Sequence, residues 1–386
     1  MVSAVLFITF FVLLVLNVPI AVCLGLSSAA AILYSGTSLT IVATNIYSGI
    51  SKFLLLAIPF FVLSGNIMAK AGISTRLIRF VDTCVGHRKG GIANVCIIVA
   101  CFFGAISGSG PATVAALGAV LIPAMVERGG FSAAFSTALM ATSSSIAIVI
   151  PPSIAFVVYA SITGVSIGDM FMAGIIPGIL MGLALVVVVM LEVRRNHVVP
   201  SNVEKASAKE RWNAFKDAFW GFLMPIIILG GIYGGFFTPT ESAAVSVVYG
   251  LFVGMVIYKE VKFKDLWEIL IDSAKTTGGI MLIVACASLF SFVCTRFGIS
   301  TAASELLARV AGNQFTFLLI CNIIFLIAGC FIDANSAMYI FIPIMLPVCK
   351  ALGYNVIAFG IMATVNLAIG QVTPPVGVNL FVAIGI

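Results

Sequence analysis

The sequence predicts an all-α polytopic membrane protein built from two inverted repeats, each with one re-entrant helical hairpin. Of its 386 residues, 61% are hydrophobic and only 9% are charged, whereas about a quarter of the residues in a soluble domain are charged. Apolar runs near the ~20 residues that cross a bilayer recur along the whole chain. In addition, one series of Gly, Ser and Pro landmarks occurs twice in the same order.

The chain opens with two apolar segments, residues 6–16 and 20–33, which are divided at Asn17 and Pro19. Asn is a favourable N-cap and Pro suits the first turn of a helix, so we expect Asn17 to cap the second segment. The opening segment lacks a basic start and a small-residue cleavage signature, which indicates a retained helix rather than a signal peptide. Residues 53–68 form the next span, and residues 170–191 close the first half.

Four landmarks of the first half recur in the second half at an almost constant spacing of 220, 226, 224 and 223 residues. Independent landmarks at one spacing indicate an internal repeat. Residues 194–216 are the only long polar stretch and form the natural linker between the halves. The pairs are Pro19 with Pro239, Gly72 with Gly298, Pro123 with Pro347, and Pro151-Pro152 with Pro374-Pro375.

The distribution of basic residues predicts how the two repeats are oriented. If the linker is cytoplasmic, sixteen of the 20 Lys and Arg residues fall on the cytoplasmic side, as the positive-inside rule expects. This threading needs five crossings and one hairpin in the first repeat, so the second repeat begins on the opposite side and is inverted. The four basic residues left outside are Lys52, Arg296, Arg309 and Lys350.

Each repeat has a predicted hairpin tip, at residues 104–114 and 329–336, and a predicted broken helix, at residues 143–152 and 370–379. A Pro-Pro pair breaks a helix because both amide donors are absent. Non-helical backbone is tolerated within hydrocarbon only where protein or a water-filled cavity satisfies its polar groups. The four interruptions therefore predict one binding site near the middle of the membrane.

The residues at these interruptions favour an alkali cation and an anionic solute. Carbonyl and hydroxyl oxygens suit a hard cation, and helix N-termini suit an anion. Asp333, which corresponds to Ser109 in the repeat, is nearly the only titratable residue there, so sodium coupling is preferred over proton coupling. Two structural alternatives stay open: the Gly and Ser residues serve close helix packing, and Asp333 only caps a helix. Glu241 fits a capping box with Thr238.

Other classes of function have little support. The nine cysteines show no C-x-x-C spacing, and there are only two histidines, so a zinc site or a Ser-His hydrolase lacks its residues. A membrane enzyme would need clustered acids or an activated nucleophile, and a channel would need a continuous polar pore. The basic residues that give the net charge of +6 lie in the gaps between apolar segments. Basic residues in such gaps set the orientation of a membrane protein, so they do not indicate nucleic-acid binding.

Four motifs give the chain a specific resemblance: GxxSGSGPATVAALG at the first tip, TPTESAA after the linker, the Ser-rich helix leading to IPPS, and TPPVGVN at residues 373–379. Together they resemble the large membrane subunit of tripartite ATP-independent periplasmic (TRAP) transporters. The resemblance implies an inner-membrane, sodium-coupled importer of organic acids such as C4-dicarboxylates or sialic acids. It also implies a four-helix small membrane subunit, a periplasmic substrate-binding protein, no cofactor other than the coupling Na⁺, and no enzymatic activity.

The resemblance further implies an elevator of the ion-transporter superfamily, with a transport domain that moves against a scaffold. The scaffold parts would be residues 1–70, 164–192 and 218–258, and the cytoplasmic linker residues 193–217. The transport part of the first repeat would be residues 71–163. Residues 259–386 would contain an arm helix, a scaffold helix, the second hairpin and its broken helix. The basic segments 76–89 and 262–275 would lie along the membrane surface and join the fixed and moving parts.

Carried over by motif, the sodium ligands would be Ser107, Gly108, Ser109, Gly110, Ser143, Ser144, Ser145, Asp333, Asn335, Ser336, Gly370 and Thr373. The substrate ligands would be Ser109, Pro111, Thr113, Ser145, Pro152, Asp333, Asn335, Thr373, Pro375 and Asn379. A stand-alone sodium- or proton-coupled anion carrier of the same fold is the alternative, followed by a channel. The second repeat ends at Ile386 without the counterpart of residues 170–191, so we expect a further closing helix beyond it.

Overall fold

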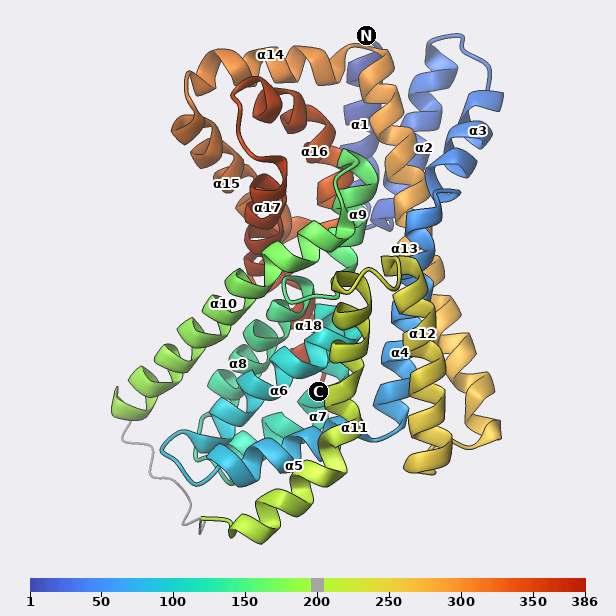
Figure 1. Cartoon of the computed structure of the whole chain (residues 1–386). Helices are drawn as coiled ribbons and strands as arrows, with labels where there is room; N and C mark the ends of the chain where they lie inside the picture. Colours follow the sequence, from blue (N-terminus) through green and yellow to red (C-terminus); the bar gives the residue numbers. More distant parts are fainter. Residues whose placement is uncertain (196–204) are drawn as a thin grey trace.

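The computed structural model describes residues 1–195 and 205–386, and this part of the chain contains helices and no strand (Figure 1). Residues 196–204 of the predicted linker lie outside the described residues. Eight of the described helices are long and apolar enough to cross a membrane. The prediction of an all-α polytopic membrane protein is therefore confirmed.

The first repeat consists of α1 Val2–Val15, α2 Ile20–Tyr34, α3 Thr40–Ile50, η1 Phe53–Leu56, α4 Ala57–Lys70, α5 Ile73–Val85, α6 Gly91–Ser107, α7 Gly110–Glu127, α8 Ala133–Ser145, η2 Ile146–Ile148, α9 Ile154–Thr163 and α10 Ile167–Arg195. The second consists of α11 Ala208–Tyr233, α12 Pro239–Phe252, η3 Val253–Ile257, α13 Phe263–Arg296, α14 Ile299–Ala311, α15 Gln314–Phe331, α16 Ala334–Ala351, α17 Val356–Gly370 and α18 Val378–Ile384.

The landmarks that recur in the sequence occupy matching places in the two halves of the fold. Gly72 and Gly298 precede α5 and α14 with φ of 68° and 71°, a left-handed conformation that glycine adopts readily. These two helices lie across opposite ends of the molecule in Figure 1. Both Pro-Pro pairs contain a cis peptide bond. The repeat is therefore inverted, as the sequence predicts.

Two local predictions are wrong and one is confirmed. Asn17 has φ of 60° and follows the end of α1, while Pro19 is the N-cap of α2 and no side chain caps that helix. Residues 262–275 are not a separate surface segment, because α13 runs without interruption from Phe263 to Arg296; the counterpart of α5 is α14. The capping box of α12 is present, with Glu241 and Thr238 bonded reciprocally.

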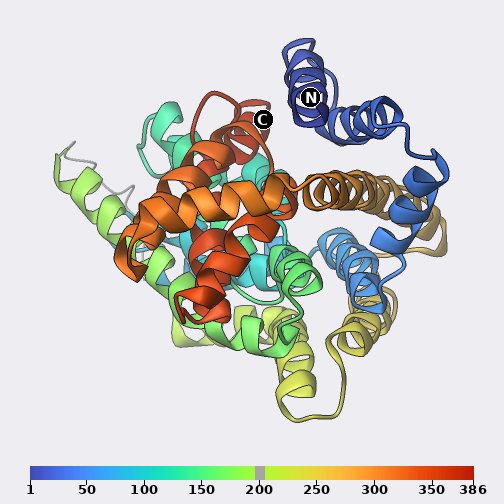
Figure 2. The ribbon, with the colours of Figure 1, turned by 90° about the horizontal axis from the view of Figure 1, so that it is seen from above.

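The helices form two groups (Figure 2). In the first group α2 packs on α13, α4 packs on α12 and α13, α1 packs on α2, and α3 packs on α13. In the second group the hairpins and broken helices of both repeats interlock: α9 packs on α16, and α18 packs on α7 and α8. The helix α10, assigned to the scaffold from the resemblance, packs on α6, α9 and α17. The hairpins are thus enclosed by elements from both halves.

Each hairpin crosses its broken helix at a backbone contact too close for a side chain. A Cβ added at Gly329 in α15 would lie 2.9 Å from the Cα of Gly370 in α17. A Cβ added at Gly104 in α6 would lie 2.8 Å from the Cα of Ala147. Both distances are shorter than real Cβ contacts. These crossings fix the two tips against the two breaks.

We expect Gly329→Ala to lower the free energy of unfolding by about 1–3 kcal/mol, the usual cost of overpacking. Thermal unfolding of the purified protein in detergent measures this effect. Gly278→Ala in α13 is the matched control, because a Cβ there meets no atom within 4 Å and Ala favours a helix over Gly. Equal unfolding temperatures for the two variants would contradict the close backbone contact between α15 and α17.

Candidate functional site

The tip of the first hairpin is a short turn held by hydroxyl groups. The helix α6 ends at Ser107, Gly108 takes φ of 61°, and Ser109 is the extended N-cap of α7. The Ser107 hydroxyl lies 2.9 Å from that of Thr113, and the Thr113 hydroxyl donates to the Ser109 carbonyl at 2.8 Å. No side chain caps α7. Its first amides and the positive end of its dipole are therefore open to a ligand.

The tip of the second hairpin has the opposite electrostatic character. Asp333 is the N-cap of α16 and accepts from the amides of Asn335 and Ser336 at 3.0 and 3.2 Å, and from the Ser336 hydroxyl. The sequence-based alternative that Asp333 caps a helix is thus seen in the structure. An ionised carboxylate has about four lone-pair sites, so one remains for a further partner.

The first tip rests on the first broken helix. After α8 and η2, residues 149–153 leave the helix and α9 begins at Ile154. The Ile154 amide donates to the Gly108 carbonyl at 3.4 Å, and a Cβ at Gly108 would lie 2.7 Å from the Pro152 carbonyl oxygen. Ser153 caps α9 by accepting from the Phe156 amide. The interrupted backbone is therefore satisfied by the hairpin and by local caps.

The second tip rests on the second broken helix in the same way. The Val376 amide donates to the Cys330 carbonyl at 3.0 Å, and the Asn379 amide donates to the Gln371 carbonyl at 3.0 Å. The two repeats meet where a Cβ at Gly110 would lie 2.6 Å from Asn379 Nδ2. Glycine at position 110 is what allows α7 and α18 to approach this closely.

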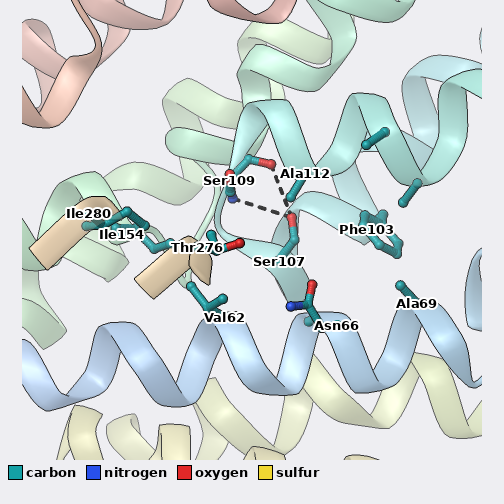
Figure 3. A pocket seen from close by; sticks show the side chains of 13 residues that line it. Val62, Asn66, Ala69, Phe103, Ser107, Ser109, Ala112, Ile154, Thr276 and Ile280 are labelled. Carbon is teal, nitrogen blue, oxygen red and sulfur yellow. Dashed lines mark hydrogen bonds between the residues drawn. The ribbon is translucent and has the colours of Figure 1, made fainter. Parts of the chain in front are cut away.

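A cavity of about 360 Å³, here called the tip cavity, lies between the two hairpin tips. A second cavity of about 400 Å³, here called the α4 cavity, continues from it along Val62, Gly65, Asn66 and Ala69 of α4 (Figure 3). The end of α4 at Lys70, expected on the cytoplasmic side from the positive-inside rule, lies beside α5, at the end of the molecule opposite α14 (Figure 1). Both cavities share Ser109, Ala112, Ile154, Thr276 and Ile280.

The structure brings many of the predicted site residues to these cavities, but not all. Those that line a cavity are Ser107, Gly108, Ser109, Gly110, Pro111, Asp333 and Asn335. Eight others are buried but line neither cavity: Thr113, Ser143, Ser144, Ser145, Pro152, Ser336, Gly370 and Asn379. The last two also line neither cavity and are not buried: Thr373, whose hydroxyl donates to the Ile369 carbonyl, and Pro375, which is exposed.

Three polar lining residues were missed by reasoning from the sequence. Gln371 lines the tip cavity and lies within the predicted break, between two residues that were chosen. Thr276 in α13 and Asn66 in α4 line the cavities from the other group of helices. No repeat landmark marks these two, because each lies in an uninterrupted helix and reaches the cavity only through tertiary packing.

Several polar atoms around the tip cavity are buried without a hydrogen-bond partner: Asn335 Oδ1, Gln371 Oε1, and both Oδ1 and Nδ2 of Asn379. Each such atom costs about 1–3 kcal/mol if it stays unpaired. No cluster of three or more His, Cys, Asp or Glu residues occurs in the described ranges. Neutral amide oxygens beside one carboxylate fit an alkali cation.

The two groups of helices touch at two further places near the cavities. Lys52 Nζ donates to the Ser161 carbonyl, in the last turn of α9, at 2.7 Å, and the Ser161 hydroxyl lies 3.0 Å from that of Tyr339 in the second hairpin. A Cβ at Gly65 in α4 would lie 3.7 Å from the Cβ of Ser107. The first group therefore contacts both hairpins.

The inverted repeats, the apolar helices and the cavity between two hairpin tips define a multi-pass membrane transport protein. The family model described as "Tripartite ATP-independent periplasmic transporter, DctM component" matches residues 7–386. The chain belongs to this family, the large permease subunit of TRAP transporters, and is thus a multi-pass protein of the bacterial inner membrane.

Relatives whose names state a transported acid align with nearly the whole chain. The C4-dicarboxylate TRAP transporter large permease protein of Pseudomonas aeruginosa is 42% identical, over 93% of this chain and 84% of the relative. The sialic acid TRAP transporter large permease protein of Vibrio cholerae is 36% identical, over 92% and 82%. The isethionate TRAP transporter permease protein DctMQ of Oleidesulfovibrio alaskensis is 40% identical, over 99% of this chain but 60% of that longer protein.

A solved structure shares the fold at low sequence identity. The crystal structure of the Alcanivorax borkumensis YdaH transporter matches with a TM-score of 0.60 and 13% identity, over 92% of this chain and 81% of that chain. At this identity the likeness concerns the fold alone. It agrees with the arrangement of helices described above.

We expect Asp333→Ala to destabilise the second tip by about 1 kcal/mol, because three donors lose their acceptor, whereas Asp333→Asn keeps a capping oxygen and changes stability by a few tenths. Thermal unfolding of both variants in detergent separates the roles of the oxygen and the charge. Equal losses in the two variants would mean that the negative charge itself holds the tip.

Proposed function

We propose that this chain is the membrane subunit of a sodium-coupled importer of an organic acid, and that it works by an elevator movement. The observation that carries the proposal is the tip cavity, where both repeats bring an interrupted helix and a hairpin tip together. Membership of the large-permease family supports a transport function. The relatives named for C4-dicarboxylate, isethionate and sialic acid all carry names of organic acids.

The anion-binding part of the proposal rests on the uncapped N-terminus of α7. The residues Gly110, Pro111 and Ala112 form this first turn and line the tip cavity. The backbone N–H groups of Gly110 and Ala112 and the helix dipole favour a carboxylate there, while Pro111 has no N–H to donate. The second tip cannot offer the same contact, because Asp333 already occupies the N-terminus of α16 and repels an anion. The carboxylate of the cargo would therefore bind the first tip.

The cation-binding part rests on the unpaired oxygens of Asn335 and Gln371 beside Asp333. A sodium ion at the second tip would give these oxygens a partner and screen the Asp333 charge from the carboxylate. Binding of either ion then favours the other, and such mutual preference is a coupling free energy between sites. A proton-coupled carrier would use Asp333 as its titrating group, which is the alternative mechanism.

The elevator part rests on the two groups of helices. The hairpins and broken helices interlock with each other, while α4 and α13 of the first group pack on them from one side. The α4 cavity gives the tip cavity a route along this boundary, so the arrangement resembles a state open to the cytoplasmic end. In the opposite state the tips would have moved relative to α4 and α13.

We further propose that a small membrane subunit and a periplasmic binding protein complete the transporter. The family description calls the system tripartite and periplasmic. The name DctMQ on a longer relative is consistent with a large and a small subunit in one chain. A stand-alone carrier remains the second candidate, and the need for a binding protein distinguishes the two.

We expect uptake to stop when sodium is replaced by potassium. The complete complex, reconstituted in liposomes with its binding protein outside, is assayed with succinate and with sialic acid as probes. Uptake should require external Na⁺ and should also be lost when the binding protein is omitted. Undiminished uptake in potassium would overturn sodium coupling, and sodium-dependent uptake without the binding protein would identify a stand-alone carrier.

An engineered disulfide tests the elevator. Gly65→Cys with Ser107→Cys joins α4 to the first tip at a Cβ separation of 3.7 Å, within the range of about 3.5–4.5 Å that a disulfide needs. We expect oxidation to arrest uptake and a reductant to restore it, with the reduced variant as reference. Gly25→Cys is the control, since its Cβ would lie 3.6 Å from that of native Cys286 within one group of helices. Full uptake by the oxidised Gly65→Cys/Ser107→Cys variant would contradict the movement.

A further inference from the structure

The amide of Asn66 has an orientation fixed by its neighbour in α13. Asn66 Nδ2 donates to Ser273 Oγ at 2.8 Å, and the Ser273 hydroxyl donates to the Ile269 carbonyl at 2.6 Å. Because the only proton of Ser273 is used on Ile269, Ser273 can only accept from Asn66. The nitrogen of Asn66 must therefore face Ser273, and Oδ1 faces the α4 cavity, towards Ser107 (Figure 3).

The first hairpin tip presents an acceptor to the same cavity. The Thr113 hydroxyl donates its proton to the Ser109 carbonyl, so the 2.9 Å contact between Ser107 and Thr113 uses the proton of Ser107. A lone pair of Ser107 Oγ is left for a further partner, since the Ser109 amide approaches it only at 3.4 Å. Two residues with an oxygen that lacks a free proton thus line the same cavity, Asn66 from α4 and Ser107 from the tip.

Apart from the first turn of α7, the described lining of the α4 cavity offers no charged side chain to an anion. Among the described residues that line it there is no Lys, Arg or His, and the other polar side chains are the rotatable hydroxyls of Ser109 and Thr276. A carboxylate needs donors, whereas a sodium ion takes neutral oxygens and fills its remaining positions with water. The lining therefore favours a partly hydrated cation over the anionic cargo.

We propose that Asn66 Oδ1 is a ligand for sodium in the α4 cavity, a site at which Na⁺ binds between the first hairpin tip and the cytoplasmic end of α4. This inference rests on the sodium coupling proposed above and adds to it a ligand from the helices that do not move. A Na⁺ bound there would lie on the path by which sodium leaves the first tip towards the cytoplasmic side. Its occupancy from the cytoplasmic side would oppose net release of sodium and so slow uptake.

The test uses inhibition of uptake by sodium inside the liposomes. The complete complex is reconstituted, the binding protein is added only outside so that one orientation works, and internal NaCl is raised against KCl with external Na⁺ saturating. Succinate or sialic acid serves as the transported probe. We expect Asn66→Leu to raise the half-inhibitory internal Na⁺ roughly three- to tenfold and Asn66→Asp to lower it by a similar factor. The half-saturating external Na⁺ should stay within about twofold.

Two comparisons separate this role from a structural one. Ser273→Ala removes the same hydrogen bond but keeps the oxygen of Asn66, so it should shift internal inhibition much less than Asn66→Leu does. Lys70, one turn away from Asn66, is already paired with Glu268 at 3.1 Å, which leaves the new carboxylate of Asn66→Asp free to act on sodium. The proposal is overturned if the Leu and Asp variants shift inhibition in the same direction or not at all, or if Ser273→Ala reproduces Asn66→Leu. Sodium-independent uptake by the unmodified complex would instead refute the proposed coupling.

Discussion

The fold depends on one constraint: backbone that leaves a helix within the membrane must find its hydrogen bonds inside the protein. The chain meets this constraint by laying each hairpin tip on its own broken helix. The Gly108 carbonyl receives the Ile154 amide, and the Cys330 carbonyl receives the Val376 amide. These pairs hold each tip at its own break, and the close approach of Gly110 to Asn379 brings the two pairs together. The cavity between them is a consequence of this pairing.

The two tips satisfy the same constraint with different residues at the N-cap. Their N-cap positions correspond in the repeat, yet Ser109 leaves the N-terminus of α7 open while Asp333 closes that of α16. The backbones of the two tips are thus related by the repeat, but only the second tip carries a negative charge. In the proposed function, this difference would let two symmetric halves hold two ions of opposite sign, which an exact symmetry of charge would not allow.

The tips and breaks were predictable from the sequence because Gly, Ser and Pro interrupt apolar runs at matching spacings. Asp333 was found for the same reason, as the only acid beside such an interruption. Asn66 and Thr276 were not, since nothing local distinguishes a polar residue that faces a cavity from one that faces another helix. Asn17 was misplaced because Asn caps helices and also adopts the left-handed conformation that ends them. The charges of residues 262–275 were read as a surface segment, although they begin a continuous helix.

The unbroken α13 sets where the route from the cavity meets water. Its 34 residues span on the order of 50 Å at 1.5 Å per residue, well beyond a hydrocarbon core of ~30 Å. The helix must tilt or protrude, and its first turns, with the exposed pair Asp272 and Lys275, are the part suited to the headgroup layer. Thr276 follows directly and lines both cavities. A solute that leaves the cavities past this threonine would therefore move along the charged first turns of α13, beside polar side chains rather than acyl chains.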